Sequence, residues 1–286
     1  ATTPRELNFL TRADVFNKPL VKWLLSTVNM LPIYRIRDGI TSLSRNEEVF
    51  QKCYNILNKN GTVLIFPEGN HNIQRRLRIL SKGFTRIIFG SLKVNPDLEI
   101  VVLPIGINYT NAKKYASSVH LIFGEPIIVN EHHTKAAMNG ASSDLKAEVS
   151  EAMKQLITHI ENAEQHDKIA SNFNEDEFLY PKTVNEKLKK MDPKNETMSS
   201  QAKEFHLLKP LIQVNSFIPL MVWKSLYPKI KEEEFIATYR FSLGISLFPI
   251  CYLLQAFIIA YFFGNLSGLI YLTVSFLIAY LFAKSR

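Results

Sequence analysis

A glutamate and a glycine stand where an apolar segment ends, and their types are typical of a ligand-binding position. Residues 62–66 are a run of apolar and β-branched residues that predicts a buried strand, and Pro67-Glu68-Gly69 follows it directly. Ligands of α/β sheets bind beyond the carboxyl ends of strands. A carboxylate there can position a substrate or nearby basic groups, and a glycine lets the backbone approach closely. We therefore predict a binding site at Glu68 and Gly69; the alternative for Glu68 is a helix cap.

Basic residues follow this turn closely. His71 comes first, then Arg75, Arg76 and Arg78, with Lys82 after them, and we predict that the arginines occupy the start of a helix. A guanidinium offers a planar fork of donors to phosphate oxygens. The group therefore predicts contact with a phosphorylated acceptor or with an anionic membrane surface. The alternative for each arginine alone is a solvated helix face.

Short apolar strands alternate with amphipathic helices over residues 8–129, which predicts an α/β domain. Strands are expected at 99–109, where Pro104 marks an edge or a bulge, and at 119–123. Helices are expected after the Ser44–Glu47 capping pattern and over residues 143–160. The predicted fold class is α/β, a mixed sheet flanked by helices, with a C-terminal two-helix transmembrane hairpin.

That hairpin is predicted from charge and length. No Asp, Glu, Lys or Arg occurs between Arg240 and Lys284, and Gly264-Asn265 divides the apolar stretch into residues 241–263 and 266–283. Each part has the roughly 20 residues that a bilayer core requires. Basic residues flank both outer ends, so the positive-inside rule places them, and the bulk of the chain, in the cytoplasm. The alternative is a buried helical hairpin in a soluble core.

Three segments are expected along the chain. Residues 1–165 form the α/β domain, 166–240 a polar and interfacial helical connection, and 241–284 the transmembrane hairpin. Within the connection, residues 203–240 combine prolines, aromatic residues and lysines, which predicts helices that lie at the membrane interface. The alternative is a linker packed on the domain.

The 286 residues carry a formal net charge of +8 and have a pI near 9.3. No nucleic-acid recognition motif accompanies this charge, and anionic lipid beside the hairpin explains it, so we predict a membrane partner and no nucleic acid. Adjacent His132 and His133 point to opposite sides of an extended chain and make a poor metal pair, so no metal site is predicted.

Three blocks together carry a family resemblance. They are Leu-Pro-Ile-Tyr-Arg-Ile-Arg at 31–37, Phe-Pro-Glu-Gly at 66–69 and Val-Leu-Pro-Ile-Gly-Ile-Asn-Tyr at 102–109. In this order and spacing they resemble the glycerolipid acyltransferase family of the PlsC type, which includes lysophosphatidate and glycerol-3-phosphate acyltransferases. Residues 9–16 also resemble the strand and helix start that follow the family's first motif. The resemblance covers residues 8–128.

The resemblance implies a membrane enzyme of phospholipid biosynthesis. It would transfer a fatty acyl group from acyl-CoA or acyl-carrier protein to a hydroxyl of a glycerophosphate or lysophospholipid, without a cofactor. Arg35 would contact the acceptor phosphate, Glu68 would position the acceptor or its basic neighbours, and Pro104 would shape the acyl pocket. His71 stands where the family carries a phosphate-binding arginine, which leaves that contact open. The missing charge could come from Arg75, Arg76, Arg78 and Lys82. The alternatives are a solvated Arg35 and a strand-edge Pro104.

The family's catalytic pair is a His-x-x-x-x-Asp motif, in which the histidine is the general base and the aspartate orients it. None of the seven histidines has an aspartate five positions later. We expect this pair upstream of Ala1, so that the chain as given is inactive. The alternative is a non-catalytic membrane module that binds lysophospholipid.

Overall fold

The computed structural model describes residues 5–34, 44–69, 72–114, 117–129, 138–191, 209–230 and 233–284. The chain divides into two compact units. Unit 1 contains residues 1–71, 75–107 and 121–159, and unit 2 contains residues 72–74, 108–120 and 160–286. The three segments expected from the sequence remain predictions.

A three-stranded parallel sheet forms the first part of unit 1. Its order is β2 (Met30–Ile33), β1 (Leu7–Arg12), β3 (Thr62–Leu64), so the N-terminal strand lies in the centre. Phe9 of β1 is level with both Met30 and Leu64. The short helix η1 (Ala13–Phe16) and then α1 (Pro19–Thr27) connect β1 to β2.

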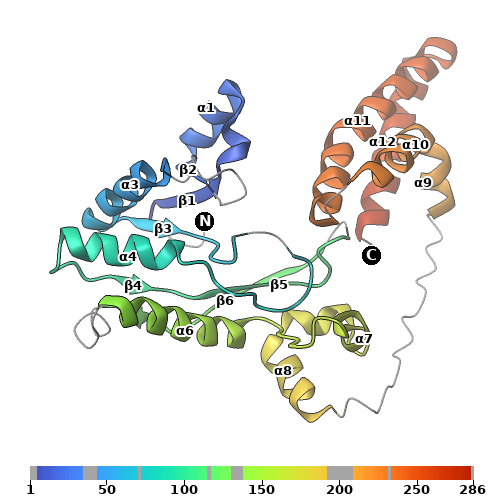
Figure 1. The fold of residues 1–286 in the computed structure, drawn as a ribbon. Coiled ribbons are helices and arrows are strands. Elements are labelled where there is room, and N and C mark those ends of the chain that lie inside the picture. The colour runs from blue at the N-terminus through green and yellow to red at the C-terminus, as the bar shows by residue number, and fades with distance from the viewer. Residues whose placement is uncertain are drawn as a thin grey trace. The chain divides into compact units, whose positions relative to one another are not determined.

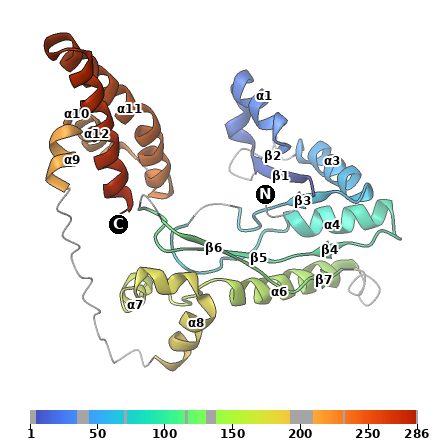
Figure 2. The same ribbon diagram turned by 180° about the vertical axis from the view of Figure 1, so that it is seen from behind.

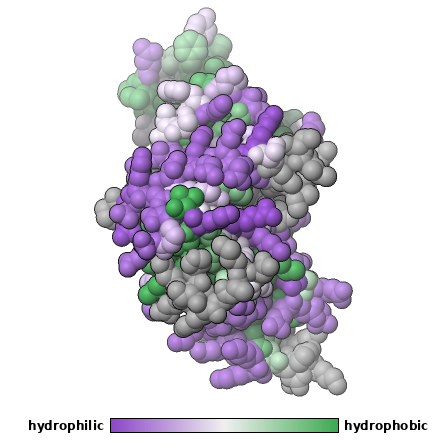
Figure 3. All heavy atoms as spheres, turned by 60° about the vertical axis from the view of Figure 1, so that its left-hand side comes forward, coloured by the Kyte–Doolittle hydropathy of each residue, from purple (hydrophilic) through white to green (hydrophobic). Residues whose placement is uncertain are grey.

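Two helices pack beside this sheet, α3 (Asn46–Asn58) and α4 (Gly83–Val94) (Figure 1). The helix expected after the Ser44–Glu47 pattern is confirmed as α3, and its residues Val49, Phe50 and Cys53 are buried with Leu10 of β1 and Ile87 of α4. The other face of α3 is polar and exposed. Figure 3, in which the left-hand side of Figure 1 comes forward, shows mainly hydrophilic side chains with small hydrophobic groups between them.

An antiparallel ribbon follows, made of β4 (Val101–Val102) paired with β7 (Ile127–Ile128), and β5 (Ile105–Tyr109) paired with β6 (Val119–Phe123). The register shifts by one residue where Pro104, whose carbonyl accepts the Gly124 amide at 2.9 Å, interrupts the first strand. This is a β-bulge, as the proline predicted. Helix α6 (Met138–Leu156) packs with α4 and the β4–β7 pair around a second core that includes Leu92, Val129 and Leu145.

Two expectations for unit 1 were inaccurate. The sheet is not one mixed sheet but a parallel sheet and separate antiparallel pairs. Residues 72–82 are not helical, and α4 begins only at Gly83. The helical interpretation was wrong because the Leu77 amide donates to His159 Nδ1 at 2.9 Å instead of to a carbonyl one turn earlier.

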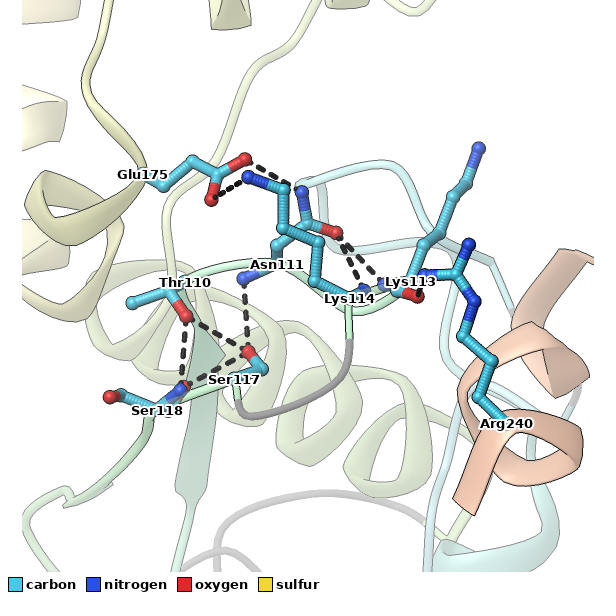
Figure 4. A network of polar contacts seen from close by, with 8 residues as sticks. All are labelled: Thr110, Asn111, Lys113, Lys114, Ser117, Ser118, Glu175 and Arg240. Atoms are coloured by element: carbon cyan, nitrogen blue, oxygen red, sulfur yellow. Dashed lines mark hydrogen bonds and ion pairs between the residues drawn. The ribbon is translucent and has the colours of Figure 1, made fainter. Parts of the chain in front are cut away.

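Unit 2 begins with a small helical module. Helix α7 (His166–Ala170), η3 (Glu175–Leu179) and α8 (Pro181–Lys190) enclose a core of Phe173, Phe178 and Val184. Figure 4 shows how the loop after β5 joins this module: Asn111 Nδ2 and Lys114 Nζ donate to the two oxygens of Glu175 at 2.8 and 2.9 Å.

The rest of unit 2 is apolar and helical. Helices α9 (Lys209–Asn215) and α10 (Phe217–Leu226) lead through η4 (Tyr227–Lys229) and η5 (Glu233–Phe235) to α11 (Ile236–Phe263) and α12 (Asn265–Lys284) (Figure 2). The predicted break is confirmed, because Gly264 separates α11 from α12 with φ +89°. Both helices are long and apolar enough to cross a membrane, by length and composition.

Candidate functional site

The three parallel strands end at one edge of the sheet, and the predicted site residues follow them. Because β1, β2 and β3 are parallel, Arg12, Tyr34 and the turn at 66–69 leave the sheet at the same edge. Tyr34 immediately precedes Arg35. The topology therefore brings together two of the three sequence blocks that carry the family resemblance.

The turn at 66–69 displays Glu68. The Gly69 amide donates to the Phe66 carbonyl at 3.3 Å and closes a β-turn with Pro67 at its second position. Gly69 has φ +74°, and a Cβ added there would meet no atom within 4 Å. The structure thus requires glycine at this position for its backbone conformation, and the space in front of Gly69 is open.

Glu68 forms an ion pair with Arg78 across the turn. Arg78 Nε and Nη2 both donate to Glu68 Oε2 at 3.1 Å, and the Arg78 and Glu68 side chains are 22% and 27% exposed. A second contact fixes the same segments, because the Ser81 amide donates to the Pro67 carbonyl at 2.7 Å. Glu68 therefore holds the Arg78 guanidinium at the carboxyl edge of the parallel sheet.

Arg75 and Arg76 lie in the irregular segment 72–82, between Glu68 and α4. Buried Leu77 and Leu80 anchor this segment, so the arginines between and before them are held near the protein surface. The Nε atom of Arg76 is buried, and no described residue accepts its hydrogen bond. Such a donor is costly to leave unsatisfied, and an anion would satisfy it.

Sequence reasoning missed two features of this edge. Asn46, the first residue of α3, accepts the Tyr34 amide and donates to the Tyr34 carbonyl, both at 2.8 Å, and so fixes the backbone that enters Arg35. Arg12, the last residue of β1, donates to both carboxylate oxygens of Asp14 at 3.1 and 2.6 Å. The sequence patterns that contain these residues do not indicate these contacts, because Asn46 bonds to the backbone of Tyr34, twelve residues earlier, and Arg12 to its near neighbour Asp14.

Arg35, His71, His132 and His133 lie outside the described residues. Pro104 is buried in the antiparallel ribbon. A shallow hollow of about 390 Å³ is lined by residues that include Arg5, Asn8 and Thr62. It lies where β1 and β3 begin, and therefore at the opposite edge of the sheet from Glu68.

The histidines that the structure describes make structural contacts. His159 Nδ1 accepts the Leu77 amide, His120 Nδ1 contacts the Leu179 carbonyl at 2.6 Å, and buried His166 pairs with Asp167 at 2.8 Å. Within the described part of the chain, no three His, Cys, Asp or Glu side chains are grouped to hold a metal ion.

Comparison with known proteins finds similarity in the part of the chain that contains this edge. Residues 1–108 match the family model described as Acyltransferase. The chain is 27% identical over 124 residues to glycerol-3-phosphate O-acyltransferase 2 of Saccharomyces cerevisiae, which is 43% of this chain and 17% of that protein. It is 26% identical over 113 residues to glycerol-3-phosphate O-acyltransferase 1 of the same organism, covering 38% and 15%. The chain spans less than a fifth of the length of these relatives. The family match covers residues 1–108, which include the parallel sheet and the turn at Glu68.

Proposed function

We propose that this chain is part of a membrane-bound O-acyltransferase that acylates a glycerophosphate, with glycerol 3-phosphate as the favoured acceptor. The family match of residues 1–108 carries the reaction class, and the names of the two yeast relatives favour this acceptor. The acyl donor in the proposal is a fatty acyl thioester of CoA or of acyl-carrier protein.

In the proposed reaction the acceptor hydroxyl oxygen forms a bond to the thioester carbonyl carbon, and the C–S bond breaks. The hydroxyl proton passes through a general base to the leaving thiolate, so the products are an ester and a free thiol. The family resemblance assigns the role of base to the histidine of a His-x-x-x-x-Asp motif. The residues present would bind and orient the acceptor.

The basic groups at the carboxyl edge of the parallel sheet fit the acceptor phosphate. Arg78 is held there by Glu68, and the buried Nε of Arg76 offers an unused donor. The Asn46 contacts fix the backbone before Arg35, the residue assigned to the phosphate by the resemblance. Charge-assisted hydrogen bonds from guanidinium groups to phosphate are among the strongest polar contacts in proteins.

Membrane attachment is the second part of the proposal. Helices α11 and α12 have the length and hydropathy of membrane spans, and Arg240 and Lys284 flank the uncharged stretch. The positive-inside rule then puts both outer ends, and the proposed catalytic domain, on the cytoplasmic face.

Acceptor-dependent release of thiol tests this function. Membranes carrying the full-length gene product would be supplied with acyl-CoA or acyl-carrier protein and with glycerol 3-phosphate, lysophosphatidate or no acceptor. We expect thiol release that requires an acceptor and is fastest with glycerol 3-phosphate. Faster release with lysophosphatidate would keep the reaction class and overturn the acceptor.

A second candidate is a non-catalytic membrane module that binds lysophospholipid. It predicts lysophospholipid binding without acceptor-dependent thiol release from either donor.

A further inference from the structure

Helices α9 and α10 form a bent pair whose corner, Asn215-Ser216, packs against the middle of the apolar hairpin. Within unit 2, α9 contacts α12 and α10 contacts α11. Ser216 is fully buried, and its hydroxyl lies 2.6 Å from the Tyr252 hydroxyl of α11. The corner is therefore fixed to the hairpin by polar contacts.

The hairpin supplies the hydrogen bonds that this corner lacks. Pro219 has no amide hydrogen, so the Asn215 carbonyl loses the donor that a regular helix would provide four residues later. Gln255 Nε2 of α11 donates to that carbonyl at 3.2 Å. Tyr271 of α12 contacts Asn215 Oδ1 at 2.5 Å and Gln255 Oε1 at 2.9 Å. A polar corner satisfied in this way can exist in an environment without water.

Two contacts show the direction of α10 along α11. The N-terminal end of α10 lies at Tyr252, where Ser216 makes its contact. Trp223, near the C-terminal end of α10, stacks under Arg240, with the guanidinium carbon 5.0 Å from the ring centroid. Arg240 is twelve residues before Tyr252 in α11. Helix α10 therefore runs antiparallel to α11, from the middle of the hairpin back to its charged end. A helix that crossed α11 at right angles would touch it at one level only.

The lengths fit half a bilayer. Helices α9 and α10 have 7 and 10 residues, which correspond to ~10 and ~15 Å at ~1.5 Å per residue. The hydrocarbon core is ~30 Å thick. Counted from Gly264, Tyr271 and Tyr252 lie seven and twelve residues away, or ~10 and ~18 Å along the helix axes. These residues thus fall in the middle of the core when Gly264 stands at its far boundary.

The outer surface of the pair is apolar and its ends are charged. No charged residue occurs between Lys209 and Lys224. The side chains that face outward include Val214, 80% exposed, and Phe217, 61% exposed, beside the corner. At the other end, Trp223 and Tyr227 lie 5.5 Å apart next to Arg240, an arrangement typical of a membrane interface.

We propose that α9 and α10 form a re-entrant element, which enters the bilayer to about half its depth beside the hairpin and returns to the same side. The acyl chains of lipids cover its outer surface, and Asn215-Ser216 is its deepest point. This differs from the interfacial helices expected from the sequence, and it rests on the proposed membrane attachment of α11 and α12.

Single cysteines test the depth. In the full-length gene product with every native cysteine replaced by alanine, Cys53 and Cys251 included, one cysteine would be placed at Val214, at Phe257 in α11 or at Lys190 in α8. Opened membranes are treated with a charged maleimide before and after detergent. We expect V214C and F257C to lose labelling in membranes and regain it in detergent, while K190C is labelled in both.

A fluorescent label at position 214 distinguishes a side chain covered by lipid from one covered by protein. The membrane lipids carry a quencher either near the headgroup or deep in the acyl chain. We expect the deep quencher to act more strongly at 214. Stronger quenching by the shallow lipid, no quenching by either lipid, or labelling of V214C while F257C is protected, would overturn the re-entrant element and leave the hairpin standing. Labelling of both V214C and F257C in membranes would instead refute the membrane attachment.

Discussion

At the scale of residues, the Glu68–Arg78 pair makes the account of the acceptor site testable. Arg78→Ala removes a guanidinium at the carboxyl edge, and we predict a roughly tenfold rise in KM for glycerol 3-phosphate. Arg86→Ala is the matched control, because Arg86 is an exposed arginine on α4. Glu68→Gln should raise KM in the same direction, since Arg78 then loses its ionic partner, while stability changes by less than about 1 kcal/mol. Equal KM values for the Arg78 and Arg86 variants would contradict this role.

Cys53 gives a prediction about pH. Burial raises the pKa of its thiol from 9.0 to about 11. We expect thiol reagents to leave Cys53 unmodified in the folded protein at about pH 8 and to modify it in denaturant, as mass spectrometry would show. Because the pKa is higher in the folded state than in the unfolded state, the burial of the neutral Cys53 thiol contributes fully to the free energy of unfolding below pH 9.0. That contribution is lost as the pH rises toward about 11. Rapid modification of native Cys53 would show that the α3 core opens readily.

The residue scale also shows where prediction from the sequence succeeds. The local sequence pattern predicted helix α3, in which Val49, Phe50 and Cys53 lie at helical spacing and face the core. The Asn46 contacts with Tyr34 were missed, because an asparagine whose partner lies twelve residues earlier in the chain leaves no periodic signal. The segment with Arg75 and Arg76 was misjudged for the same reason, since His159 takes the Leu77 amide from far along the chain.

At the scale of elements, Gly106 permits β5 and the end of α6 to meet. A Cβ at Gly106 would lie 2.1 Å from the Leu156 carbonyl oxygen, which is backbone and cannot rotate away. We predict that Gly106→Ala lowers the free energy of unfolding by about 1–3 kcal/mol. Gly140→Ala, where the nearest atom is 3.9 Å away within α6, should be neutral or stabilising by up to about 1 kcal/mol. Thermal unfolding in detergent compares the two, and equal melting temperatures would contradict the packing argument.

The corner between α9 and α10 yields a paired prediction. Gln255→Leu removes the donor to the Asn215 carbonyl, and we expect a loss of about 1 kcal/mol in the detergent-solubilised protein. Pro219→Ala restores an amide hydrogen four residues after Asn215, so it should suppress most of the Gln255→Leu defect. A double variant whose losses simply add would show that Gln255 does not substitute for the missing amide.

The ends of helices and strands could be predicted where a single glycine or proline in the local sequence interrupts the element. Gly264 ends α11 and Pro104 interrupts the antiparallel ribbon, as their residue types indicated. Strand pairing could not be predicted in the same way. The division between the parallel sheet and the antiparallel pairs depends on which strands meet, and alternating apolar residues do not encode their partners.

At the scale of the whole molecule, the chain combines a polar α/β part that carries the acyltransferase match with an apolar helical part. The proposed function requires both, because a soluble thioester must meet an acceptor whose product is a lipid. The charge of +8 agrees with a position beside anionic lipid. The division into a polar part and an apolar part could be predicted from composition, since the uncharged run between Arg240 and Lys284 is visible in the sequence alone.

We propose that the carboxyl edge of the parallel sheet, where Glu68 and Arg78 form their ion pair, binds the phosphate of an acceptor for acyl transfer, and the family resemblance adds Arg35 to this role. The most direct measurement is thiol release from acyl-CoA or acyl-carrier protein by membranes with the full-length gene product, as the wild type, Arg35→Ala and Arg86→Ala. We predict release that depends on glycerol 3-phosphate, is lost in the Arg35 variant and is retained in the Arg86 control. A wild-type protein that reaches the membrane and binds lysophospholipid, but releases no thiol with any acceptor, would contradict the account.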